Sequence, residues 1–106
     1  MKVWNLVNDN NNATANQFVF DVPNGYVFQS YDSMIAFYDL NTGKVYITKD
    51  WEYSNTTRKH FYMFLRDYCG ACGQIRKNDV LYEIEQGNYI LVDNIKFSEV
   101  KVSIKK

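Results

Sequence analysis

The stretch that decides the fold is residues 28–65, FQSYDSMIAFYDLNTGKVYITKDWEYSNTTRKHFYMFL. Within it, residues 34–40 are apolar except for Asp39, a pattern typical of a central strand covered on both faces. Asn41-Thr42-Gly43 predicts a three-residue hairpin loop with glycine at the bulge position. Residues 45–49 then return as the next strand. The stretch therefore predicts two strands joined by a tight turn, followed by a link and a helix.

The helix is predicted to begin just after Tyr53 and to run to about Cys69. Its first N–H groups need acceptors, which Ser54, Asn55 or Thr56 can supply as a cap. Gly70 is the natural C-terminal stop. Spacing at i, i+3, i+4 and i+7 predicts one buried apolar stripe: Phe61, Phe64, Leu65 and Tyr68.

Upstream, residues 3–7 indicate a short strand or an N-terminal segment tucked against the core, and residues 8–16, NDNNNATAN, indicate a flexible polar loop. Residues 18–22 and 26–31 predict two more strands, joined by a turn at Pro23-Asn24-Gly25 in which glycine accepts the left-handed conformation. With Asp32-Ser33 as the next link, residues 18–49 form a four-stranded antiparallel meander.

Downstream, a second, shorter helix is predicted from Asp79 to Gln86, with Asn78 as its cap and Gly87 as its end. Its predicted buried side is Val80, Leu81 and Ile84. Residues 89–93 predict a strand, and residues 97–104 predict a last strand with a bulge. The expected fold class is α+β: an antiparallel β-meander packed against one main helix, with a second short helix and a C-terminal strand pair.

Length and charge limit the classes of function. The 106 residues fit a single domain spanning 1–106. The net charge is zero, but the chain up to Thr57 carries a net −3 and the remainder a net +3. The overall charge balance, with only this mild asymmetry between the two parts, argues against a strongly basic nucleic-acid-binding domain. Met1-Lys2 is not followed by an apolar run, and no stretch is long enough to span a membrane, so we expect a cytoplasmic protein with no membrane partner and reduced cysteines.

The residues that could carry chemistry do not form a recognisable catalytic or metal pattern. Cys69-Gly-Ala-Cys72 is the one CxxC, and His60 is the one histidine, so four tetrahedral zinc ligands are not supplied by spacing. A redox CxxC opens a helix, whereas this one closes a helix at its negative end, which raises a thiol pKa. We expect Cys69 to pack as a small apolar residue and Cys72 to lie in the turn. The prediction is no catalytic residue, no metal, no cofactor and no enzyme activity. A small enzyme is the remaining alternative, and it requires Cys69, Cys72 and His60 to converge around a metal ion.

The start of the main helix gathers hydroxyls and cations. Free N–H groups at a helix N-terminus bind anions, and Arg58 and Lys59 oppose the helix dipole unless an anion or acid lies nearby. The alternative is that the hydroxyls are ordinary caps and that Asp50 and Glu52 neutralise the cations. Trp51 is expected to cover the core rather than to bind a partner. The predicted partner-binding residues are Tyr53, Thr56, Thr57, Arg58, Lys59, Tyr62 and Arg66.

Part of the chain also carries a recognisable pattern, F-Q-S-Y-x-S-x-I-A, a hairpin, then W-x-Y-S-x-T-T-x-K, running from Phe28 to Lys59. In this pattern the chain resembles small proteins and domains of unknown function encoded by bacteriophages and mobile elements. The resemblance implies a phage or mobile-element origin and gives no reaction, although some small phage proteins inhibit host immunity, including CRISPR effectors. Together with the excess of tyrosine, the neutral charge and the missing catalytic pattern, the resemblance favours a non-enzymatic accessory protein that binds a host or phage protein in the bacterial cytoplasm.

The alternative function is a small nucleic-acid-binding accessory protein. Its phosphate contacts would come from the basic second half of the chain, and Tyr62 and Phe97 would stack on bases. This hypothesis requires the basic residues to gather on one face: Arg58, Lys59, Arg66, Arg76, Lys77, Lys96 and Lys101.

Overall fold

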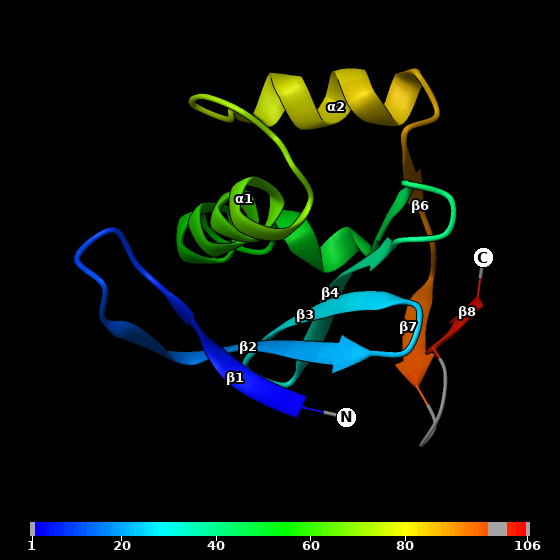
Figure 1. Ribbon diagram of the computed structural model, residues 1–106. Helices are drawn as coiled ribbons and strands as arrows, with labels where there is room; N and C mark the ends of the chain where they lie inside the picture. The colour runs from blue at the N-terminus through cyan, green and yellow to red at the C-terminus, as the bar shows by residue number, and fades with distance from the viewer. Residues whose placement is uncertain (1, 98–101, 106) are drawn as a thin grey trace.

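A computed structural model of the chain describes residues 2–97 and 102–105, and its fold is α+β, as predicted (Figure 1). The elements follow one another as β1 (Lys2–Val7), β2 (Ala13–Val22), β3 (Gly25–Ser30), β4 (Ser33–Asp39), β5 (Val45–Ile47), the 3-10 helix η1 (Lys49–Glu52), α1 (Asn55–Tyr68), α2 (Lys77–Glu85), β6 (Tyr89–Leu91), β7 (Asn94–Phe97) and β8 (Val102–Lys105). Within the described part of the chain, neither α1 nor α2 is long and apolar enough to cross a membrane.

The main sheet has six strands in the order β1-β2-β3-β4-β5-β6. The strands β2 to β5 form the predicted antiparallel meander, β1 extends it antiparallel to β2, and β6 pairs parallel to β5. The predicted C-terminal strand pair is confirmed, since β7 and β8 form a separate antiparallel sheet. Its first member is β7 rather than the strand predicted at residues 89–93, which is β6 and joins the main sheet. The bulge predicted for the last strand falls on residues 98–101, which lie outside the described residues.

The flexible loop predicted over residues 8–16 is too long, because β2 already begins at Ala13 and pairs with Val7 of β1. The turn itself is closed by Asn8, whose Oδ1 accepts hydrogen bonds from the backbone N–H groups of Asn10 and Asn12, both at 3.0 Å. Asparagine side chains stabilise turns in this way. Residues 13–16 therefore belong to β2 although none of them is a large apolar residue.

Two of the predicted turn details are wrong, and one is confirmed. Gly25 does not take a positive φ; instead, a Cβ at this position would lie 1.8 Å from the backbone oxygen of Tyr38, so glycine is required for close approach of β3 to β4. The link before β4 is Tyr31-Asp32 rather than 32–33, and Tyr31 is left-handed with φ of 53°. Gly43 has φ of 74° and its N–H bonds to the oxygen of Asp39 at 2.8 Å, as a glycine at the bulge position should.

The sheet is buried on both faces, and β4 contributes to both, as its apolar sequence predicts. Ala36 belongs to the larger core between the sheet and the helices, where the rings of Phe28 and Phe64 stack with centroids 5.5 Å apart. Phe37 belongs to a second core on the opposite face, which Ile95 of β7 covers. Figure 1 shows α1 lying across one face of the sheet, with α2 beyond it.

The helix α1 begins and ends where the sequence predicts. Ser54 is its cap, and the Ser54 Oγ accepts a hydrogen bond of 3.0 Å from the N–H of Thr57. Beyond the helix, Gly70 takes a φ of 77°. The predicted stripe faces the core, with Phe61, Phe64 and Leu65 fully buried and Tyr68 packed against them. Trp51 in η1 is 1% exposed and packs on Phe61, so it covers the core as expected.

The helix α2 differs from its prediction at its start and on its buried face. It begins at Lys77 rather than Asp79, because the carboxylate of Asp79 accepts a 2.8 Å hydrogen bond from the N–H of Arg76; Asn78 is not the cap. Val80 is fully buried, whereas Leu81 is 43% exposed. The end at Gly87, with φ of 81°, is confirmed.

Candidate functional site

Four of the predicted binding residues lie along one groove on the outer face of α1. Arg58, Lys59, Tyr62 and Arg66 follow one another along the helix and line a hollow of about 490 Å³. The opposite wall comes from two segments that are remote in sequence, Asp9 at the tip of the β1–β2 hairpin and residues 73–75 after α1. The groove is therefore a product of tertiary structure rather than of the helix alone. We call it the α1 groove.

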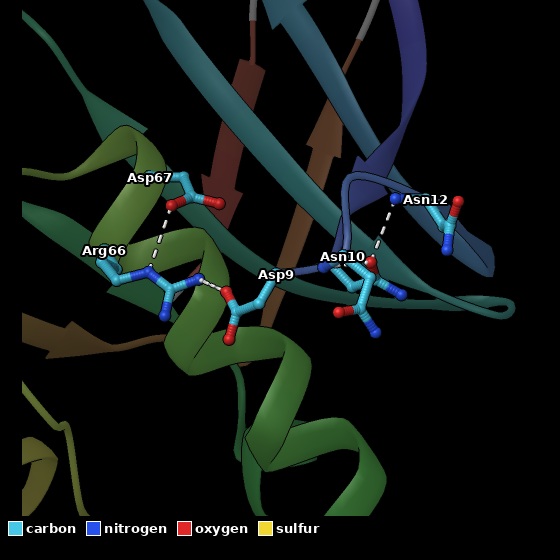
Figure 2. Close-up of polar contacts among 6 residues, drawn as sticks. Asp9, Asn10, Asn12, Arg66 and Asp67 are labelled. Atoms are coloured by element: carbon cyan, nitrogen blue, oxygen red, sulfur yellow. Dashed lines mark hydrogen bonds and ion pairs between the residues drawn. The ribbon is translucent and has the colours of Figure 1, made fainter.

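An ion pair connects the two walls of the α1 groove. The guanidinium of Arg66 lies 2.9 Å from a carboxylate oxygen of Asp9 and 3.2 Å from one of Asp67 (Figure 2). The hydrogen bond that Arg66 donates to Asp67 is the main reason why the pKa of Arg66 is raised. Figure 2 shows the side chain of Asp9 reaching from the hairpin turn toward Arg66 on α1. The charge of Arg66 is thus largely compensated within the molecule.

Arg58 and Lys59 differ in how their charges are held. The Arg58 guanidinium donates to the backbone oxygen of Glu52 at 3.3 Å and to the side-chain oxygen of Asn55. The Glu52 carboxylate pairs with Lys77 at 3.0 Å, so it does not form the predicted ion pair with the cations of α1. Lys59 is exposed and forms no ion pair with any residue of 2–97. Lys59 is consequently the cation of the groove that is most available to a partner.

Tyr62 supplies an aromatic ring to the middle of the groove. It is half-buried, and its ring lies 6.1 Å from that of Phe61. Burial raises the pKa of Tyr62, while the nearby Arg58 lowers it less strongly. The phenol is therefore neutral at neutral pH and can donate a hydrogen bond, and its ring offers apolar surface between charged neighbours.

The other three predicted residues lie elsewhere. Tyr53, Thr56 and Thr57 line a separate cleft of about 570 Å³ between the start of α1 and the turn that contains Tyr31. Thr57 is 6% exposed, and its Oγ1 accepts a 3.1 Å hydrogen bond from the Ser54 hydroxyl, so its side chain serves the helix cap. The structure thus divides the predicted binding set between the α1 groove and this cleft.

The cysteines and the histidine do not converge. His60 Nδ1 lies 2.8 Å from the backbone oxygen of Thr56 on its own helix. Cys69 and Cys72 are free thiols, the first half-buried and the second exposed, and burial raises the pKa of Cys69. Among the side chains of residues 2–96, no group of three or more His, Cys, Asp or Glu residues is placed to hold a metal ion.

Sequence reasoning missed Asp9 and Ser30. Asp9 lies in the asparagine-rich turn, and its contact with Arg66 spans 57 positions, so no local pattern indicates it. Ser30 is 4% exposed and lines the second cleft. The signal for Ser30 was available, since it alternates with the buried Phe28 on β3 and faces the same side of the sheet.

The fold and the site together define an α+β protein built on a mixed six-stranded sheet, with a polar groove along its longer helix. Residues 1–81 match the Family of unknown function (DUF8033), and the chain belongs to that family. The matched region contains every residue that lines the α1 groove and the second cleft. None of the curated proteins and none of the solved structures matches the chain.

Proposed function

We propose that this chain is a non-enzymatic accessory protein that acts by binding another protein through the α1 groove. The observation that carries the proposal is the convergence of Arg58, Lys59 and Tyr62 on one hollow whose second wall comes from the β1–β2 hairpin and residues 73–75. Arginine and tyrosine are the residues most enriched where protein interfaces gain their binding energy. An unpaired lysine at the rim supplies electrostatic attraction to an acidic partner.

The composition of the groove favours a protein partner over a nucleic acid. Met63 and Ile75 give it an apolar floor, and Asp9 places a carboxylate directly opposite the cations. A phosphate backbone would be repelled by that carboxylate, whereas a protein surface can match a mixture of charges. The expected partner therefore presents acidic groups toward Arg58 and Lys59, an apolar centre toward Met63 and Ile75, and no acidic group toward Asp9.

The distribution of the basic residues also speaks against the nucleic-acid alternative. Lys77 is paired with Glu52, and Lys96 lies on β7, which covers the face of the sheet opposite to α1. Lys101 lies outside the described residues. Arg58, Lys59 and Arg66 line the groove, where Arg66 is already paired, and the exposed Arg76 follows directly after the wall residues 73–75. Few free cations predict a weak, shallow salt dependence for any nucleic-acid binding.

The proposal includes a phage or mobile-element origin for the protein. The likeness in Phe28–Lys59 to phage and mobile-element proteins supports an accessory role in the bacterial cytoplasm, with a host or phage protein as partner. A complex of the host's defence, such as a CRISPR effector, fits this role as a target for inhibition. Of the residues that carry the likeness, Phe28, Ile35, Ala36 and Trp51 are buried. Lys59 also carries the likeness and lines the groove. The likeness therefore concerns the scaffold and one residue of the groove.

Affinity capture with a matched pair of charge reversals tests the proposal. The tagged chain is incubated with nuclease-treated host lysate, in parallel with the variants Lys59→Glu and Lys49→Glu. Both lysines are exposed, but only Lys59 lines the groove. We expect a defined protein partner that Lys59→Glu loses and Lys49→Glu keeps. Capture of nucleic acid alone in untreated lysate, or equal capture by both variants, would contradict the proposal.

A further inference from the structure

The cleft at the start of α1 has features of a small-molecule site that the α1 groove lacks. It is enclosed by the turn after β3, the residue before the helix cap and the first turn of α1, and its volume of about 570 Å³ is in the usual range for ligand pockets. Two exposed rings stand at it, with Tyr31 58% and Tyr53 84% exposed.

The floor of the cleft contains a polar atom without a partner. Ser30 lines the cleft and is 4% exposed, and its Oγ forms no hydrogen bond with any residue of the described chain. Gln17 lies directly opposite Ser30 in the β2–β3 ladder, is 1% exposed, and has an equally unpartnered Oε1 in the described structure. Buried polar atoms left unpaired are costly and rare in native proteins. A ligand group that reaches Ser30 from the cleft would remove that cost.

The start of α1 adds a backbone N–H donor to the cleft, in addition to the Oγ of Ser30. Thr57 N–H is satisfied by Ser54, but the N–H group of Thr56, which also lines the cleft, has no acceptor within the helix. On the other side of the cleft, the carboxylate of Asp32 can only accept. The ligand must therefore both donate and accept hydrogen bonds at closely spaced positions.

The charges of the cleft disfavour ionic ligands. The residues that line the cleft include no lysine, arginine or histidine, and Asp32 is their one ionised group. An anion would have no countercharge and would face Asp32, while a cation would face the positive end of α1. What remains is a neutral molecule rich in hydroxyl groups.

We propose that this cleft binds a neutral saccharide of one or two pyranose units. Ring hydroxyls can donate to Ser30 Oγ and Asp32 and accept from the N–H group of Thr56. The C–H face of a pyranose can lie on Tyr31 or Tyr53, because the negative face of an aromatic ring attracts the positive edge of C–H bonds. The left-handed φ of 53° at Tyr31 holds that ring in an unusual place beside the cleft, as strained residues at binding sites do.

Saturation-transfer NMR with glucose, galactose, mannose and N-acetylglucosamine as probes tests this inference. We expect transfer from the protein to at least one sugar, with a Kd that rises by about tenfold in Tyr53→Ala and in Ser30→Ala. Tyr82→Ala is the matched control, since Tyr82 is 59% exposed on α2 away from the cleft, and it should bind as the natural chain does. Tyr53 is exposed enough that its truncation leaves the fold intact, which the amide spectrum of each variant checks.

Two results of the sugar experiment would overturn the inference. One is no transfer to any of the four sugars at millimolar concentration. The other is transfer that persists unchanged in Tyr53→Ala while the variant is folded, which would place the binding elsewhere. Inorganic phosphate is included as a separate probe: shifts of the Asn55 and Thr56 amides with phosphate, in the absence of sugar binding, would identify an anion site and contradict a neutral ligand.

Discussion

The carboxylate of Asp9 and the guanidinium of Arg66 lie 2.9 Å apart and join the β1–β2 hairpin to the longer helix. This ion pair connects the two walls of the α1 groove, so it sets both the shape of the groove and its charge. Asp9 is 83% exposed and Arg66 is 40% exposed. Exposed ion pairs contribute little to stability, and we therefore expect the pair to matter more for recognition than for folding.

Replacing Asp9 by Asn should lower the free energy of unfolding by less than about 1 kcal/mol, because the pair is exposed and solvent screens it. The measurement is urea denaturation of Asp9→Asn, Arg66→Gln and the double variant. The double-mutant cycle isolates the interaction of the two side chains. A coupling of several kcal/mol would mean that the hairpin depends on this contact for its stability, contrary to our account.

Two glycine substitutions should differ sharply in their cost. In Gly25→Ala the new Cβ would meet the backbone oxygen of Tyr38 at 1.8 Å, so β3 and β4 must move apart, and we expect a loss of about 3 kcal/mol or more. In Gly43→Ala the Cβ meets nothing within 4 Å, and only the left-handed backbone is penalised, by about 1 kcal/mol.

Thermal or chemical denaturation of the two alanine variants gives this order directly. Gly43→Ala serves as the control for the general cost of adding a methyl group in a turn. An equal loss in both variants would show that the close approach of β3 to β4 at Gly25 is absent.

The two thiols should react at different rates with iodoacetamide. Burial raises the pKa of Cys69, which lowers its thiolate fraction and its access to reagent, whereas Cys72 is exposed. At pH 8 we expect Cys72 to be alkylated faster than Cys69 by about tenfold or more. Mass spectrometry of Cys72→Ser and Cys69→Ala separates the two rates; faster alkylation of Cys69 would contradict its placement in the core.

Stability should fall at alkaline pH. Burial raises the pKa of Tyr89 to about 12, whereas the pKa of a tyrosine in the unfolded chain is about 10. Above pH 10 the unfolded state therefore loses a proton that the folded state keeps, and the stability contributed by neutral Tyr89 declines as the pH rises from about 10 to 12. The raised pKa of Cys69 has the same sign and begins to act near the ordinary thiol pKa of about 8.5.

The measurement is the free energy of unfolding from pH 8 to 11.5 in the natural chain and in Tyr89→Phe. The phenylalanine variant should lose less stability than the natural chain over the upper part of this range. Tyr82→Phe is the control, because Tyr82 is 59% exposed. An identical pH dependence in all three proteins would show that Tyr89 titrates as it does in the unfolded chain.

The features that could be predicted from the sequence are those fixed by neighbouring residues. Gly43 and Ser54 act through the turn and the cap that they form locally, and the stripe that includes Phe64 follows from helical periodicity. The meander followed from strand alternation and turn residues. These local signals were sufficient for the α+β class and for the bounds of α1.

The remaining features depend on contacts between distant residues. The parallel pairing of β5 with β6 brings Val45 beside Tyr89, and no local pattern specifies that partner. The sequence predicts a left-handed turn at Gly25, but glycine is required there because the backbone of Tyr38 on the next strand lies too close for a side chain. That contact cannot be inferred from the neighbouring residues. The predicted binding residues lie in two separate hollows for the same reason. The β1–β2 hairpin supplies a wall of the α1 groove, and the turn at Tyr31 supplies a wall of the second cleft.

Site-specific photo-crosslinking tests the central claim, that a protein partner binds along the α1 groove, most directly. A benzophenone amino acid is placed at Lys59 in the groove or at Lys96, an exposed position on the strand that covers the opposite face of the sheet. Our account predicts that the captured protein is cross-linked from position 59 and not from position 96. Cross-linking from position 96 alone, in a protein that binds its partner with undiminished affinity, would contradict it.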